Sequence, residues 1–209
     1  MGLFTLNNLF LLLTGLVCIY LLWRFYSRWK ISHKLYDLYY AMGVLVLLVS
    51  GLLLIFLGMD ILASPYVLTV ASLIPLGISM GLVEQYFPKW KRAYKWFALV
   101  GFLAIAVFSI AQIDLGRKIS VPLFHSVAGL VICLGPFLAT GAPKGFRWVS
   151  MGGLLIGLGG IALAFLANGS QLLFFSAEFV QLILTLLLLL MILAFTWGFV
   201  KDIKRQKPA

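Results

Sequence analysis

The chain has 209 residues, of which 63% are apolar and only 11% are charged, and its formal net charge is +10. A soluble domain carries about twice that share of charged residues. The composition therefore excludes a soluble globular protein, and the abundance of apolar residues also excludes a disordered chain. It predicts an integral membrane protein that contacts the lipid bilayer.

Continuous apolar runs predict membrane-spanning helices. A bilayer core about 30 Å thick takes about 20 residues of helix to cross. Seven segments reach this length, at 3–23, 38–58, 64–83, 96–113, 120–140, 148–167 and 177–199. We therefore expect an all-α bundle of seven transmembrane helices, forming a single domain over 1–209 with short loops. No basic region precedes the first run and no small-residue cleavage site follows it, so we expect it to remain as a helix.

The positive charges predict the orientation of the chain. Fourteen of the sixteen Lys and Arg residues fall after the first, third, fifth and seventh segments, and only Arg117 and Lys118 fall on the other side. Positive residues in short loops are retained in the cytoplasm during insertion. We therefore expect the N-terminus outside and the C-terminus in the cytoplasm. Because each basic group is short and lies beside a membrane segment, nucleic-acid binding is not expected.

An internal repeat is suggested by two stretches that recur in the same order. Residues 9–18 resemble 123–133 at an offset of 114, and residues 42–57 resemble 151–166 at an offset of 109. A true repeat predicts a three-one-three plan with parallel units at 1–95 and 114–209, and a solute pathway between them. Chance similarity between Leu-rich helices is the alternative. The plan resembles that of the SWEET sugar facilitators in architecture, but their Pro-Gln pair is absent, so the resemblance implies no function.

The segment 177–199 carries a polar stripe. Glu178, Gln181 and Thr185 fall within about 60° of one another on a helix. Since an ionisable residue at membrane depth is a candidate functional residue, these side chains are predicted to line a solute or proton pathway. The alternative for Glu178 is a carboxylate at the membrane boundary, stabilised by the helix dipole.

His125 lies near the outer end of the segment 120–140. If the fifth and seventh segments are neighbours, its imidazole comes close to Glu178 and Gln181. Such a group could contact a solute or relay a proton. The alternative is one interfacial histidine that makes a hydrogen bond between helices.

Proline and glycine mark two further features. Pro75 and Pro136 lie inside apolar segments, where each removes a backbone donor and is a candidate hinge, with a simple kink as the alternative. Gly153, Gly157 and Gly160 lie on one face of the segment 148–167. We expect this face to pack closely against another helix, while a flat ligand is the alternative.

No residue pattern predicts catalysis. The stretch Gly77 to Gly81 matches Gly-x-Ser-x-Gly, but that motif requires a turn from strand to helix, and this stretch ends a membrane helix. Neither a metal-binding spacing nor a cofactor-binding motif occurs, so we expect no cofactor, no metal and no enzymatic activity.

Two functions fit these features. The first is a small-solute or ion transporter, with His125 and the polar stripe at its entrance. The second is a non-catalytic subunit of a larger membrane complex, or a homo-oligomer, held together by the glycine-rich face. The convergence of polar residues favours transport.

Overall fold

A computed structural model describes residues 6–167 and 177–205 of the chain. The regular elements of this part are all helical: α1 Leu6–Ser32, α2 Leu35–Leu57, the 3-10 helix η1 Met59–Ala63, α3 Pro65–Ala71, α4 Leu73–Tyr86, α5 Lys91–Ile110, α6 Asp114–Leu138, α7 Trp148–Ala167 and α8 Ala177–Arg205. The all-helical fold expected from the sequence is confirmed for these residues.

Long apolar helices account for most of the described chain. Six spans are long and apolar enough to cross a membrane, with α3 and α4 joined as one of them, Pro65–Tyr86. Over its described side chains, Trp148–Gly160, α7 is a shorter apolar helix. The chain therefore has the multi-pass helical character of an integral membrane protein, and its apolar outer surface suits contact with lipid.

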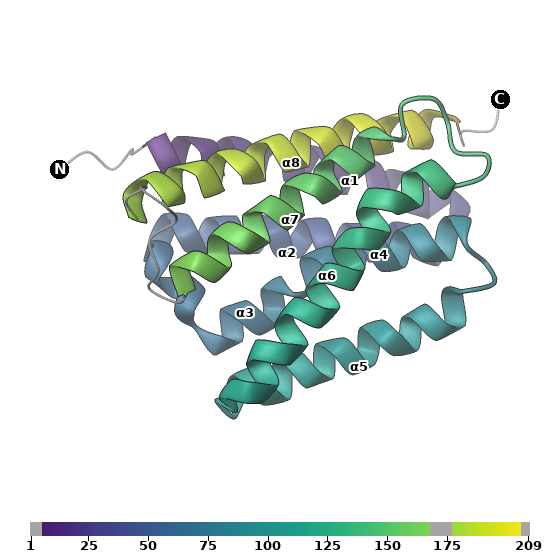
Figure 1. The fold of residues 1–209 in the computed structure, drawn as a ribbon. Coiled ribbons are helices and arrows are strands. Elements are labelled where there is room, and N and C mark those ends of the chain that lie inside the picture. Colours follow the sequence, from purple (N-terminus) through teal and green to yellow (C-terminus); the bar gives the residue numbers. More distant parts are fainter. Residues whose placement is uncertain (1–5, 168–176, 206–209) are drawn as a thin grey trace.

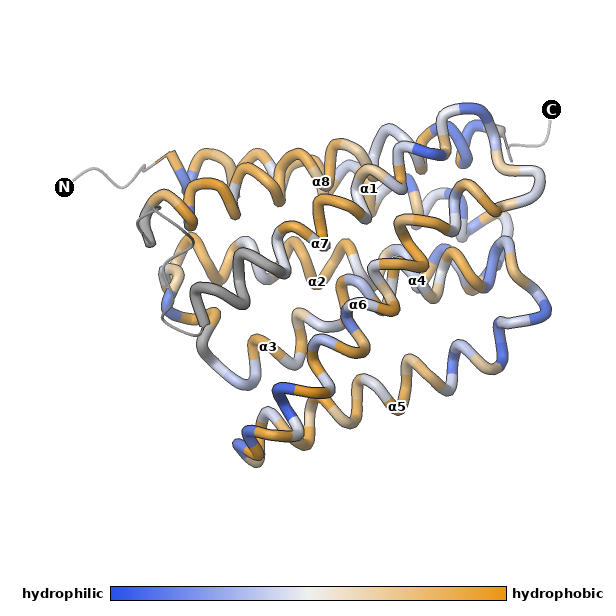
Figure 2. The backbone as a smooth tube through the Cα atoms, in the orientation of Figure 1, coloured by the Kyte–Doolittle hydropathy of each residue, from blue (hydrophilic) through white to orange (hydrophobic). Residues whose placement is uncertain are grey.

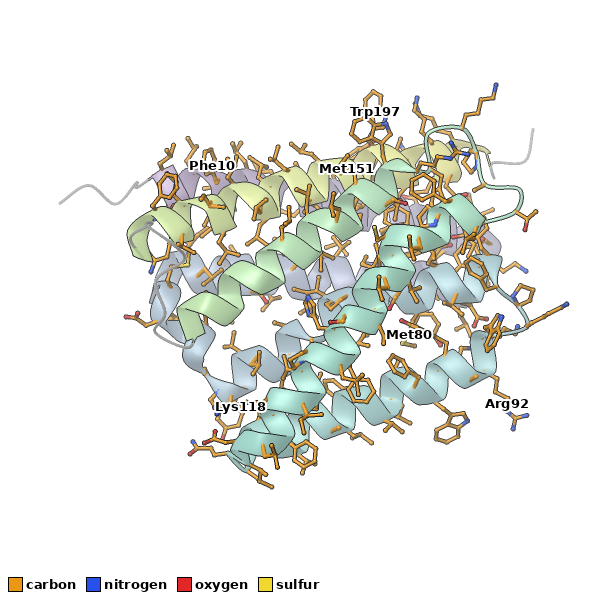
Figure 3. All side chains as sticks on the ribbon, viewed as in Figure 1. Phe10, Met80, Arg92, Lys118, Met151 and Trp197 are labelled. Atoms are coloured by element: carbon orange, nitrogen blue, oxygen red, sulfur yellow. The ribbon has the colours of Figure 1, made fainter. Side chains whose placement is uncertain are left out.

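Most of the helices run side by side along one axis, with α6 crossing them obliquely, and α1 begins at the opposite end of the bundle from the end of α8 (Figure 1). Hydrophilic residues gather toward the two ends and hydrophobic residues fill the middle (Figure 2). We call the end at which α1, α4, α6 and α8 finish the basic end, and the opposite end the far end. Arg92 lies at the basic end and Lys118 at the far end (Figure 3).

Several helices extend beyond the apolar runs that predicted them. α5 begins at Lys91 rather than 96, and α6 at Asp114 rather than 120. α1 ends at Ser32 rather than near 23, α2 begins at Leu35 rather than 38, and α8 continues to Arg205 rather than ending near 199. These extensions carry charged residues that the sequence placed in loops or a tail. Among these charges, Arg28, Asp37 and Asp202 are buried against one another, as described below, whereas Lys30, Lys201 and Lys204 are exposed.

The helices pack in a closed ring. In the described part of the chain, α1 packs against α2 and α8, α2 against α4, α4 against α6, α6 against α7, and α7 against α8. The remaining long helix, α5, lies outside this ring against α3, α4 and α6. Apolar side chains from all six ring helices form one cluster inside it. The interior of the ring is thus packed rather than open.

Glycines allow the closest approach between ring helices. A Cβ on Gly43 of α2 would lie 2.9 Å from the carbonyl oxygen of Ile74, and one on Gly77 of α4 would lie 2.9 Å from the backbone nitrogen of Gly43. The two backbones are therefore in contact. This packing accounts for Gly77, the first residue of the Gly-x-Ser-x-Gly match.

Candidate ionic site at the basic end

A buried ionic cluster joins four helices at the basic end. It consists of Arg28 from α1, Asp37 from α2, Gln85 and Tyr86 from α4, and Asp202 from α8. The three charged residues are only 6%, 0% and 1% exposed for Arg28, Asp37 and Asp202. A group of charges this deeply buried in an apolar bundle is rare without a functional or assembly role.

Arg28 is the centre of this cluster. Its Nε donates to Oδ1 of Asp37 at 2.6 Å, and its Nη1 donates to Oδ2 of Asp202 at 2.6 Å. Nη2 lies 2.5 Å from Oδ1 of Asp37, in a geometry that makes no hydrogen bond. The guanidinium also lies over the ring of Tyr36, 5.1 Å from its centroid. Arg28 therefore connects α1 to its neighbours on both sides of the ring.

The carboxylate of Asp202 receives further donors from α4. Gln85 Nε2 donates to Oδ2 at 2.8 Å, and the Tyr86 hydroxyl donates to Oδ1 at 2.7 Å. The amide of Gln85 is held in turn by Tyr40, whose hydroxyl donates to Gln85 Oε1 at 2.9 Å. Because both carboxylates pair with Arg28 and accept further hydrogen bonds from neutral donors, the cost of burying these charges is reduced.

A hydrogen bond from Ser32 also orients the carboxylate of Asp37. The Ser32 hydroxyl donates to Oδ2 of Asp37 at 3.1 Å, while the other oxygen faces Arg28. Ser32 also accepts a hydrogen bond from the backbone nitrogen of Lys34 at 3.2 Å. The turn between α1 and α2 and the ionic cluster are therefore one connected structure.

An aromatic cluster packs directly beside the ionic cluster. The ring of Phe199 lies 4.5 Å from that of Tyr40, 5.2 Å from Phe25 and 5.9 Å from Phe146, measured between centroids. Tyr86 contacts Phe146 at 5.1 Å. These rings come from α1, α2, α4, α8 and the α6–α7 loop, so the ionic and aromatic clusters together close the basic end of the ring.

The helix faces explain why these residues meet. The buried residues of α1 are Leu11, Thr14, Cys18, Leu21, Phe25 and Arg28. They follow one another at alternating spacings of three and four, which keeps a single helix face turned inward. In α8, Phe195, Gly198 and Asp202 are likewise buried at spacings of three and four, so they share one inward face. The hydropathy pattern places Arg28 in a loop, although the spacing that relates Leu21 to Phe25 on the inward face also leads to Arg28.

The structure places His125 between α6 and α7. Its Nε2 lies 3.1 Å from the position of a Cβ on Gly160, and its imidazole also interacts with the backbone carbonyl of Ile156. Nε2 is buried and has no hydrogen-bond partner among the described residues. The imidazole therefore faces the backbone of α7.

The polar stripe of α8 faces a different helix. Thr185 is buried, and its hydroxyl lies 3.1 Å from Oδ1 of Asn7 in α1. Gln181 is half-buried, and the side chain of Glu178 lies outside the described residues. Since α7 stands between α6 and α8 (Figure 1), Thr185 and His125 are not brought together.

The two prolines have different effects. The third apolar segment is broken at Ser72, between α3 and α4, about one turn before Pro75. Because Pro75 has no backbone N–H, the carbonyl of Ala71, four positions earlier, lacks its usual helical hydrogen-bond donor. Pro136, by contrast, lies within continuous α6, two residues from its end at Leu138. Their roles as hinges remain predictions.

The glycine face of α7 is in contact at its ends. A Cβ on Gly153 would lie 2.8 Å from the backbone nitrogen of Cys133, and Gly160 faces His125. A Cβ on Gly157 would meet no heavy atom within 4 Å, and the same holds for Gly129 of α6. The face therefore packs tightly against α6 at Gly153 and more loosely toward the middle of the bundle.

No set of three or more His, Cys, Asp and Glu side chains in the described part of the chain is arranged to hold a metal ion. The two cysteines are both free thiols, Cys18 buried and Cys133 half-buried. The chemistry of the site therefore rests on its ion pairs and hydrogen bonds.

No protein-family model matches the chain, and neither a curated protein nor a solved structure matches it. Function must accordingly be argued from the geometry of the site.

Proposed function

We propose that this chain is a seven-span membrane carrier for a small solute or ion, held closed at its basic end by the ionic and aromatic clusters. In this proposal α3 and α4 form one broken span, α7 is a full span, and the chain is not an enzyme. The N-terminus lies outside and the basic end faces the cytoplasm, because positive loops are retained there.

The proposed carrier has two three-span units. The order of neighbours in the ring supports this division: α1, α2 and α4 follow one another, then α6, α7 and α8, and the two groups meet at α1–α8 and α4–α6. A pseudo-two-fold axis along the membrane normal would exchange these groups while keeping every contact of the ring. The fourth span, α5, stays outside, as in the three-one-three plan.

The ion pair between Arg28 and Asp202 is the observation on which the proposal rests. It joins the first unit to the second at the basic end, and it is buried. A non-catalytic subunit does not require a buried ion pair between its own three-span units. A carrier, by contrast, must close one end of the bundle while the other end receives the solute. Gln85 and Tyr86 strengthen the same connection from α4.

The far end is proposed as the entrance. His125, Gln181 and Glu178 lie toward this end, and the positions of Gly129 and Gly157 have space beside them. Pro75 and Pro136 are the proposed hinges. Thr185 is proposed to hold α8 against α1 through Asn7 rather than to line the pathway, because its hydroxyl is turned to that neighbour.

Reconstitution tests this function. Purified protein in liposomes should take up at least one member of a panel of alkali cations, sugars, amino acids and carboxylates faster than protein-free liposomes, with saturation. Arg28→Ala should change this uptake, whereas Lys30→Ala, an exposed residue of the same helix, should leave it unchanged. Folded protein that moves nothing, and that purifies from its native membrane with larger proteins in fixed ratio, would instead make the chain a subunit.

A further inference from the structure

The partners of Asp202 resemble a binding site for a carboxylate. A guanidinium, a carboxamide and a phenol, from Arg28, Gln85 and Tyr86, point donors at its two oxygens over distances of 2.6 to 2.8 Å. All of these donors come from α1 and α4, while the carboxylate comes from α8. Combinations of an Arg with neutral donors are those that proteins use to hold carboxylate ligands.

Two of the three donors, Arg28 and Gln85, are oriented by hydrogen bonds to residues of α2. Arg28 is fixed by Asp37, which is itself held by Ser32. Gln85 is oriented by the Tyr40 hydroxyl on its oxygen, so its NH₂ group must point the other way, toward Asp202. A site whose donors are already oriented loses less entropy on binding a ligand. The hydrogen bonds that orient Arg28 and Gln85 would therefore remain if Asp202 moved away.

We propose that Arg28, Gln85 and Tyr86 form the binding site for the carboxylate group of a small organic anion, and that Asp202 occupies this site as an internal substitute while the basic end is closed. The inference rests on the proposed carrier function and names its class of solute. The structure already shows that a carboxylate fits among these donors, so an incoming carboxylate would replace Asp202 without a change in local charge.

The surroundings favour an anion over a cation. The groups that point at the site are donors, whereas a cation requires oxygen ligands or an unpaired carboxylate. The basic end also concentrates anions, since most Lys and Arg residues of the chain lie there. Because solute and Asp202 compete for Arg28, binding of the solute would shift the ring toward the state in which α8 has moved away.

Chemical rescue tests the site directly. Asp202→Ala removes the internal carboxylate and leaves the donors, so the variant should lose thermal stability in mild detergent. Sodium formate or acetate should then raise its Tm by a few degrees in a saturable manner, as expected for about a tenfold excess over Kd. Sodium chloride at the same concentration should not. The double variant Arg28→Ala, Asp202→Ala should show no rescue, and neither should Asp202→Asn, in which an amide still fills the site.

Uptake by the wild-type protein provides a second test, which holds even if Asp202→Ala does not fold. Liposomes containing the protein should take up labelled succinate or glutamate, but not the diamine cadaverine or the neutral sorbitol. Uptake of cadaverine or sorbitol alone would overturn the carboxylate site and leave the carrier function standing. Rescue by formate together with no uptake of any solute would support the carboxylate site and contradict the carrier function. Absence of both rescue and carboxylate uptake would overturn the inference.

Discussion

Arg28 and Asp202 are separated by 174 positions in the chain, yet Nη1 of the first donates to Oδ2 of the second at 2.6 Å. Both lie beyond the continuous apolar runs of their helices, which cover 3–23 and 177–199. Each is nonetheless buried, because α1 and α8 continue as helices and turn these residues inward. The pair determines how the first and last helices of the ring meet.

Replacement of Arg28 by Ala should be among the most destabilising single changes at the basic end. It leaves Asp37 and Asp202 buried without their shared cation, which costs about 3–5 kcal/mol for a buried pair. Thermal unfolding in mild detergent would measure the loss, with Lys30→Ala as the matched control on an exposed position of the same helix. Equal Tm values for the two variants would show that the ionic cluster contributes nothing to stability.

Phe199→Ala should weaken the aromatic cluster. Phe199 is 0% exposed and packs against four other rings, so truncation leaves a cavity and costs about 3–5 kcal/mol. Trp197→Ala on the same helix removes a larger side chain that is 58% exposed and should have a much smaller effect. If the buried ring of Phe199 stabilises this end, Phe199→Ala should lower the Tm more than Trp197→Ala does. A larger decrease in Tm for Trp197→Ala would contradict this prediction.

Gly153 and Gly157 of α7 should respond differently to replacement by alanine. A Cβ on Gly153 would lie 2.8 Å from backbone of α6, which cannot move aside, whereas one on Gly157 would meet nothing within 4 Å. Gly153→Ala should therefore lower the Tm. Gly157→Ala should leave it unchanged or raise it slightly, because alanine favours the helix by up to about 1 kcal/mol. A lower Tm for Gly157→Ala than for Gly153→Ala would show that the α6–α7 contact is arranged differently.

Thiol labelling should establish the orientation of the chain. With Cys18 and Cys133 replaced by Ser, a single cysteine is introduced either at Ala111, exposed at the far end, or at Lys89, exposed at the basic end. A membrane-impermeant maleimide added to intact cells should label the first variant, and the second only after the cells are opened. Labelling in the opposite order would invert the proposed topology.

The all-helical fold was predictable from the sequence because the apolar runs are long and uninterrupted. The residues at which the helices begin and end were less predictable. A hydropathy pattern treats Arg28, Asp37 and Asp202 as solvated loop residues, but their burial depends on partners that lie far apart in the chain. The signal that could have found Arg28 is its position on the inward face of α1, at the spacing set by Leu21 and Phe25.

The predicted polar site required knowledge of helix neighbours that one sequence does not contain. His125 and Thr185 are each turned toward an adjacent helix, as expected for polar side chains in lipid, but α6 and α8 both pack against α7. Helix-face arithmetic shows which residues of one helix point the same way. It does not show which other helix they point to.

The long separation of Asp202 from its partners in the chain also bears on how the bundle folds. During synthesis Arg28 and Asp37 emerge together and can enter the membrane as a neutral pair within one helical hairpin. Gln85 and Tyr86 follow, and their acceptor is translated only with α8. The contacts of Asp202 with Arg28, Gln85 and Tyr86 span 116 to 174 positions of the chain. Closure of the basic end is therefore a long-range event, which we expect to be slow because loop closure must precede the contacts that stabilise it.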